Sequence, residues 1–130
     1  MKKLTKTHNC PCGSGLFFHL CCDRFLQKKE KPETPLELMR SRYTAYTCHD
    51  NDYIKQTWYP STRPVEPITT DPHIKWIRLE VIRHEEKHND GLVEFIAYCK
   101  VNGRAQKMHE TSRFLKEGGQ WYYLDGTFDE

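Results

Sequence analysis

A chain of 130 residues, of which 37% are hydrophobic and 12% aromatic, is long enough to bury the core of one ordinary domain, which excludes a disordered tail. The net charge of +2 excludes a global electrostatic footprint for nucleic acid. No run approaches the about 18 apolar residues of a membrane span, and no apolar stretch follows the N-terminal lysines. We therefore expect a cytoplasmic protein with no membrane partner.

The first 31 residues are strongly basic. They hold seven Lys or Arg residues against two acidic ones, a difference of 7 − 2 = +5, so the other 99 residues carry −3. A basic segment of this kind predicts an acidic partner surface, and both an acidic protein and RNA fit it. The alternative is that the basic side chains only offset the charge of nearby thiolates.

Four of the six cysteines lie within the segment CPCGSGLFFHLCC (10–22). A reducing compartment disfavours a disulfide, and a thioredoxin-like site needs a Cys-x-x-Cys pair after a strand. Two close pairs separated by a short loop instead supply the four tetrahedral ligands of a structural Zn²⁺ ion. The sequence therefore predicts one zinc ion bound by Cys10, Cys12, Cys21 and Cys22. His8 or His19 in place of one cysteine stays an alternative.

Metal binding explains how so short a segment folds, because it is too small to bury a core of its own. The GSG sequence at 13–15 allows a sharp turn and lets backbone N–H groups point at the sulfurs. Four thiolates leave no open coordination position for a substrate, so we expect a folded docking element rather than a catalyst. Lys6, Arg24 and Lys28 are the candidate partner contacts.

The polar stretch 27–35 reads as a linker between the zinc-binding segment, 1–26, and a main domain, 36–130. Thr34, Pro35 and Glu37 are typical of a helix start with a capping box. A second, shorter helix is expected from Asp50 to the residues before Pro60, followed by a proline-rich loop.

From residue 74 onward the apolar residues recur with a period of two. Ile77, Leu79 and Val81 are expected on the buried face of the first strand. Hairpin turns are predicted at 88–91, with Asp90-Gly91 at the tip, at 102–104, and at the Gly pair 118–119. Helices followed by an antiparallel meander indicate an α+β fold, with a curved sheet covered by helices on one side and open to a partner, such as a second copy, on the other.

Two resemblances become specific at this point. CPCGSGLFFHLCC resembles the SEC-C motif, the zinc-binding tail of the bacterial preprotein translocase motor, in its Cys-x-Cys-x-Ser-Gly opening and its closing Cys-Cys pair, where many members have Cys-His. This resemblance implies zinc ligation by the four cysteines and a protein partner such as an export chaperone or the ribosome. LMRSRYTAY, TWYPSTRP, VEFIAY, HETSRF and WYYLDG resemble, in that order, the YchJ-like family of small bacterial proteins. The family's main domain is similar to the nuclear transport factor 2-like fold, which implies a cone of helices over a strongly curved antiparallel sheet.

Cone-shaped folds of this type often hold a pocket at the open end. Period-two alternation in MHETSRF puts Glu110 and Ser112 on the same face as two apolar residues, so the carboxylate needs a partner. The natural counter-ions are Arg40, Arg42 and Arg63. The candidate pocket residues are Tyr43, Trp58, Glu110 and Ser112.

The sequence leaves two readings of this pocket and favours the first. In one, arginine, Glu110 and Ser112 form a polar network that joins helix to sheet. In the other, Glu110 is the general base of a lyase, isomerase or hydrolase, with Arg42 and Ser112 beside it. The function that the sequence predicts is therefore a zinc-binding adaptor, with a small-molecule enzyme as the alternative.

Overall fold

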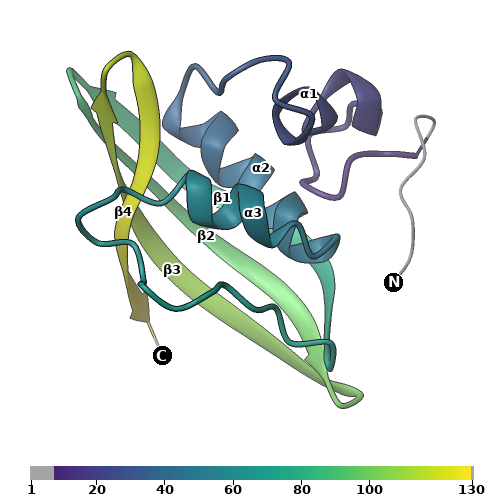
Figure 1. Ribbon diagram of the computed structural model, residues 1–130. Coiled ribbons are helices and arrows are strands. Elements are labelled where there is room, and N and C mark those ends of the chain that lie inside the picture. The colour runs from purple at the N-terminus through teal and green to yellow at the C-terminus, as the bar shows by residue number, and fades with distance from the viewer. Residues whose placement is uncertain (1–7, 130) are drawn as a thin grey trace.

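The computed structural model describes residues 8–129 (Figure 1). A short 3-10 helix, η1 (Phe18–Leu20), and a single-turn helix, α1 (Asp23–Leu26), form the N-terminal module. Two helices follow, α2 (Pro35–Thr47) and α3 (Asn51–Gln56). The four strands are β1 (Ile74–Lys87), β2 (Asp90–Val101), β3 (Arg104–Glu117) and β4 (Gln120–Asp129).

The strands form one antiparallel sheet in the order β1-β2-β3-β4, a meander in which each strand pairs with its neighbour in sequence. The helices cover one face of this curved sheet, as the predicted α+β fold requires (Figure 1). The main core lies between α2 and the sheet, with Leu38, Phe114 and Trp121 fully buried. None of the helices in the described part of the chain is long and apolar enough to cross a membrane.

Helix α2 begins where the capping signals predict. The Thr34 side chain accepts a hydrogen bond from the Glu37 backbone N–H at 3.1 Å, and Pro35 occupies the first turn. The Glu37 carboxylate reaches back to accept from the Glu33 N–H at 2.8 Å, one residue before the cap. Side chains of the local sequence therefore satisfy the Glu37 and Glu33 backbone donors where the helix begins.

Helix α3 begins as predicted but ends earlier than Pro60. Asp50 caps it by accepting from the Tyr53 N–H at 3.1 Å. It ends at Gln56 because the next residues pair with β4: the Tyr123 N–H donates to the Thr57 carbonyl and the Tyr59 N–H to the Tyr123 carbonyl, both at 2.8 Å. Tertiary hydrogen bonding, not the proline, thus ends this helix.

All three predicted hairpins form, but the predicted tip of the first was wrong. Asn102–Gly103 and Gly118–Gly119 have positive φ angles, as tight hairpin turns require. In the first hairpin Lys87 pairs with Asp90, so the tip is 88–89 rather than 90–91. Gly91 lies inside β2, where a Cβ atom would overlap the ring of Pro35.

The faces of β1 also differ from strict alternation. A bulge between Trp76 and Arg78 turns Ile77 outward, so this side chain is exposed rather than buried, whereas Leu79 is buried and Val81 half-buried. Trp76 takes the inner position and packs against the core.

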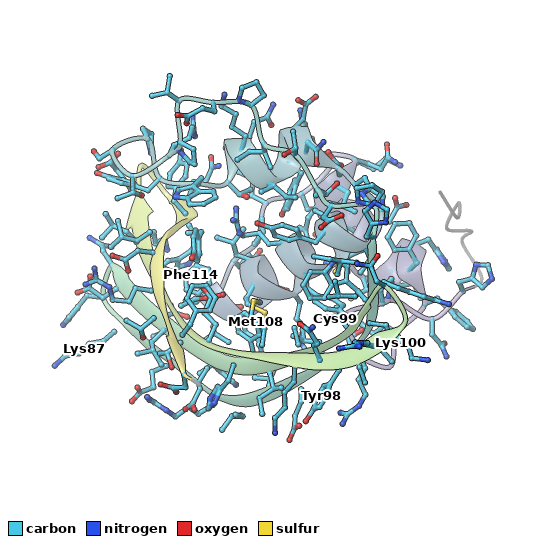
Figure 2. All side chains as sticks on the ribbon, turned by 90° about the horizontal axis from the view of Figure 1, so that it is seen from below. Lys87, Tyr98, Cys99, Lys100, Met108 and Phe114 are labelled. Atoms are coloured by element: carbon cyan, nitrogen blue, oxygen red, sulfur yellow. The ribbon has the colours of Figure 1, made fainter. Side chains whose placement is uncertain are left out.

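Figure 2 shows the two sides of the sheet clearly. Met108 and Phe114 point toward the helices, as the period-two pattern of β3 predicts, and Tyr98 points away from them.

Candidate metal centre and cavity

The four cysteines of the N-terminal module converge. All four are buried, and their sulfur atoms lie within 4.8 Å of one another. Sγ of Cys21 is 3.6 Å from that of Cys12 and 4.0 Å from that of Cys22. Four thiolates at about 2.3 Å from one tetrahedral zinc ion require sulfur separations of about 3.8 Å. The cluster therefore fits a metal ion with no rearrangement of the chain, and no histidine is needed to complete the set.

The electrostatics of the cluster indicate a cation. A hydrogen bond from Cys10 holds the pKa of Cys12 well below its usual range, and the same bond raises the pKa of Cys10 to about 11. A hydrogen bond from Cys22 lowers the pKa of Cys21 to about 6, while its neighbours hold the pKa of Cys22 far above normal. The thiols can support some of the four negative charges by themselves, but full ionisation requires a positive ion at the centre.

The loop between the cysteine pairs has the conformation that its sequence predicts. Gly13 and Gly15 have positive φ angles of 79° and 88°, which turn the chain between the two pairs. Between them, the Ser14 hydroxyl lies 3.1 Å from Sγ of Cys21, and the Ser14 backbone N–H helps to lower the pKa of Cys12. The backbone and the serine thus stabilise thiolates from outside the ligand set.

The metal module packs directly on α2. Nη1 of Arg40 donates to the Cys12 carbonyl at 2.5 Å, and Sγ of Cys10 lies 3.7 Å from Oγ1 of Thr44. On the next turn of the module, Phe25 is 3% exposed and packs with residues of α2 and α3. The predicted N-terminal module and the main domain are therefore in direct contact through α2 and α3.

The three predicted basic contacts have different positions. Lys28 is exposed, and Lys6 lies outside the described residues. Arg24 is occupied within the module: Nε donates to the Cys21 carbonyl at 2.9 Å, and Nη1 pairs with Glu30 at 3.2 Å. Arg24 thus holds the second cysteine pair in place, whereas Lys28 and the nearby Lys29 and Lys31 are exposed cations.

Sequence reasoning missed an apolar surface on the same module. Leu16, Phe17 and Leu20 are 49%, 47% and 54% exposed. They belong to the loop and 3-10 helix that separate the two cysteine pairs, and the Phe17 ring stacks against that of His19. We call these three residues the knuckle patch. The signal was present in the sequence, since three large apolar residues cannot all turn inward in a segment whose interior is filled by four cysteines.

A second candidate site lies between α2 and the concave face of the sheet. A cavity of about 350 Å³ is lined mainly by aromatic and other apolar side chains. The structure brings the predicted pocket residues together there: Tyr43, Trp58, Glu110 and Ser112 all line it, as does Arg42. Two of the lining residues, Met108 and Phe114, are seen on the inner face of the sheet in Figure 2.

The expected arginine forms no direct ion pair with Glu110, although the charges of Arg42 and Glu110 interact at longer range. Glu110 is buried, and its Oε2 accepts from the Ser112 hydroxyl at 2.7 Å and from the Tyr123 hydroxyl at 3.0 Å. Within the described residues no cation lies within 4.0 Å of its carboxylate. Its role as a general base stays a prediction, now with two hydroxyl donors in place of an arginine.

The three arginines have other partners. Nη1 of Arg42 donates at 2.7 Å to the Ile54 carbonyl and to Oγ1 of Thr57. Nε and Nη2 of Arg63 donate to the Trp58 carbonyl. Arg40 is committed to the metal module, as described above. Each of them donates hydrogen bonds to backbone carbonyls at the end of a helix or turn. A sequence pattern does not show which carbonyls need such a donor.

Two residues that sequence reasoning overlooked complete the Glu110 environment. Tyr123 supplies the second hydroxyl, and its ring lies 4.5 Å from Cζ of Arg42. Burial, and then the charge of Glu110, raises the pKa of Tyr123 above its ordinary value. Gly126, paired with Ser112 across β3 and β4, leaves the space that the carboxylate occupies, because a Cβ there would overlap Oε2.

Comparison with known proteins matches both parts of the chain. Residues 34–126 match the family model described as YchJ, middle NTF2-like domain. A UPF0225 protein of Chromobacterium violaceum is 51% identical over 124 residues, covering 90% of each chain. Another, from Ralstonia nicotianae, is 41% identical over 132 residues, covering 92% of this chain and 91% of the relative.

Two solved structures share the fold. The solution structure of a SEC-C motif containing protein from Rhodopseudomonas palustris has a TM-score of 0.84 and 36% identity, covering 94% of this chain and 99% of that one. The crystal structure of a SEC-C motif containing protein from Psychrobacter arcticus has a TM-score of 0.76 and 27% identity, covering 96% of this chain and 85% of that one.

Proposed function

The chain belongs to the YchJ-like family, whose uncharacterised UPF0225 members it matches over nearly their whole length, and from this premise we propose that it is a zinc-stabilised adaptor that docks on an acidic protein through its N-terminal module. The observation that carries the proposal is the knuckle patch, Leu16, Phe17 and Leu20, exposed on a module held together by four converging cysteines.

Zinc is the metal that the ligand set favours. Four buried thiolates with tetrahedral spacing suit Zn²⁺ or an iron–sulfur centre, and the sulfur separations fit a single ion. A single ion with four thiolate ligands has no open position, so its role is to hold the module in its folded shape. The metal thereby fixes the loop that presents the knuckle patch.

The charge of the module selects the partner. The first 31 residues carry +5, and a zinc ion with four thiolates adds −2, which leaves +3. Lys28, Lys29 and Lys31 are exposed in the segment that follows α1. A module that is basic overall and exposes an apolar patch fits a protein segment that carries apolar side chains among acidic ones. The SEC-C resemblance suggests two partners, an acidic export chaperone and the ribosome. A chaperone of acidic composition, or an acidic segment of a ribosomal protein, would provide such a surface.

Site-specific crosslinking in the native cell tests the proposal. A photoreactive residue in place of Phe17 is expected to crosslink to a protein of acidic composition. The same residue in place of Phe128, which is 60% exposed at the other end of the chain, is the matched control and is expected not to. The purified partner should then bind a variant with Leu16, Phe17 and Leu20 all changed to alanine at least about tenfold more weakly, with an unchanged zinc content.

Three outcomes contradict the proposal. They are crosslinks from position 17 to RNA, crosslinks to a second copy of the chain, and equal crosslinking from position 128. Elemental analysis of protein purified under reducing conditions tests the metal separately, because a zinc content far below one ion per chain contradicts the zinc assignment whatever the partner.

A further inference from the structure

The cavity has the size and the walls of a small-molecule site. Its volume of about 350 Å³ equals roughly a dozen water molecules at ~30 Å³ each and lies within the range of ligand pockets. The walls are mostly rings and thioethers; Tyr43 and Tyr46 of α2 both pack edge-on against Trp76 of β1. Water gains few hydrogen bonds against such walls, so an apolar, ring-shaped body fills this space better.

Several polar groups on the lining have hydrogen-bonding capacity that no bond in the described part of the chain uses, and three of them lie close together. The indole Nε1–H of Trp58 is buried and has no partner. Both hydrogen bonds of Arg42 come from Nη1, which leaves its Nε and Nη2 donors unused. Both hydrogen bonds to Glu110 end on Oε2, which leaves Oε1 as an unused acceptor. Of these groups only the Trp58 indole nitrogen is fully buried without a partner, and such a group is costly unless something binds it.

These groups lie around one aromatic ring. The guanidinium of Arg42 lies over the ring of Tyr123, the hydroxyl of Tyr123 donates to Glu110, and the ring of Trp58 packs edge-on against that of Tyr123 at 5.1 Å. Donors and an acceptor are therefore presented close together, at one region of an otherwise apolar cavity.

The charges at this region select a neutral ligand. One buried cation, Arg42, and one buried anion, Glu110, sum to zero, and no ion pair within 4.0 Å involves either of them in the described part of the chain. A ligand carboxylate would be attracted to Arg42 and repelled by Glu110, and an ammonium group would meet the reverse. A neutral group with a donor beside an acceptor satisfies both side chains.

We propose that the cavity binds a small, planar, uncharged molecule of the carboxamide class, whose amide N–H donates to Oε1 of Glu110 and whose carbonyl accepts from Arg42 and Trp58. A primary carboxamide, a lactam and a cyclic imide share this edge. The apolar body of the ligand occupies the aromatic part of the cavity. The inference is independent of the docking function, since it uses no residue of the metal module.

Four probes with one ring system and different head groups test it: naphthamide, naphthoate, naphthylmethylamine and methylnaphthalene. Each is titrated into the zinc-loaded full chain by calorimetry, and the site is located by NMR shifts of the Met108 methyl group, which lines the cavity. Naphthamide is expected to bind at least about tenfold more tightly than the other three, the difference that one or two buried hydrogen bonds produce.

Two variants and one control assign the contacts. Glu110→Gln and Trp58→Phe are each expected to weaken naphthamide binding about tenfold. Trp58→Phe retains an aromatic ring, so it keeps the test decisive if Glu110→Gln does not fold. The control is Glu94→Gln, the same substitution in the neighbouring strand, where the carboxylate contacts His109 and Arg83 instead of the cavity.

The inference is overturned by any of three results: no probe moves the Met108 signal, an analogue without the amide binds as tightly as naphthamide, or the two cavity variants bind naphthamide as the wild type does. The first result would make the cavity a packing defect, and the second a purely hydrophobic or a charged site.

Discussion

Gly126→Ala tests whether the Glu110 carboxylate is held where the structure places it. Gly126 lies in β4 with an ordinary extended backbone, so alanine meets no conformational penalty there. The added Cβ would overlap Oε2 of Glu110 and lie 2.9 Å from Cδ and 3.1 Å from Cγ. The carboxyl group must therefore leave its place, and the open direction is the cavity that it lines.

The cost follows from the bonds that the displaced carboxylate gives up. Its Oε2 accepts from Ser112 at 2.7 Å and from Tyr123 at 3.0 Å, and a hydrogen bond to a charged group contributes about 1.5–3 kcal/mol. Losing both, less what the carboxylate regains in the cavity, predicts a decrease of about 3 kcal/mol in the free energy of unfolding. Urea unfolding of the zinc-loaded protein, followed by tryptophan fluorescence, measures this decrease.

A double-mutant cycle separates this cause from a general distortion of β4. In a Glu110→Ala background there is no carboxylate to displace, so Gly126→Ala is expected to be nearly neutral, and the two substitutions should couple by at least about 2 kcal/mol. If Gly126→Ala costs the same in both backgrounds, the glycine is not reserved for Glu110 and the reasoning is refuted.

Three further predictions concern packing, the metal and pH. Phe25 is 3% exposed, so Phe25→Ala should lower the free energy of unfolding, measured in urea, by about 3–5 kcal/mol. Phe17 is 47% exposed, so the control Phe17→Ala should lower it by less than about 1 kcal/mol. Equal decreases would contradict the packing of α1 on α2 and α3. Arg40→Ala removes the donor to the Cys12 carbonyl and should weaken zinc binding about tenfold in competition with a chromophoric chelator, while Arg83→Ala on the outer face should leave it unchanged. Hydrogen bonds from Arg113 lower the pKa of the Asp125 carboxyl, so Asp125→Asn should destabilise the protein at neutral pH. Because the pair is exposed, the decrease in the free energy of unfolding should be less than about 1 kcal/mol. The difference between Asp125→Asn and wild type should vanish as the pH falls through the lowered folded-state pKa, where the carboxyl takes up a proton; a difference that persists in acid would show another cause.

The parts of the fold that local chemistry decides were predictable from the sequence. Thr34 with Glu37 fixes the start of α2, and the Asn102–Gly103 pair fixes a hairpin, because in each case the residues that satisfy the backbone are neighbours in sequence. The cysteine spacing likewise predicted the convergence of four thiols, since the loop between the pairs is short and its glycines adopt positive φ.

The errors arose where a distant element decides. The bulge that turns Ile77 outward depends on the register of β1 against β2, and the early end of α3 depends on pairing with Tyr123. Glu110 was correctly placed inside and Ser112 beside it, but the expected arginine does not pair with it directly, because Arg40, Arg42 and Arg63 donate to backbone carbonyls instead. Alternation along one strand shows which residues face inward and not which of the inward groups meet.

Helix α2 connects the two candidate sites. One side of it holds the metal module through Arg40 and Thr44, and the other supplies Arg42 and Tyr43 to the cavity. A helix of 13 residues is marginal alone in water, so its position depends on packing against both neighbours. Leu26 strengthens this dependence, since it packs against the cysteine cluster and also against the cluster that joins α2 to α3. A partner bound to the knuckle patch would thus be held at a fixed orientation to the cavity, which a module on a free linker would not provide.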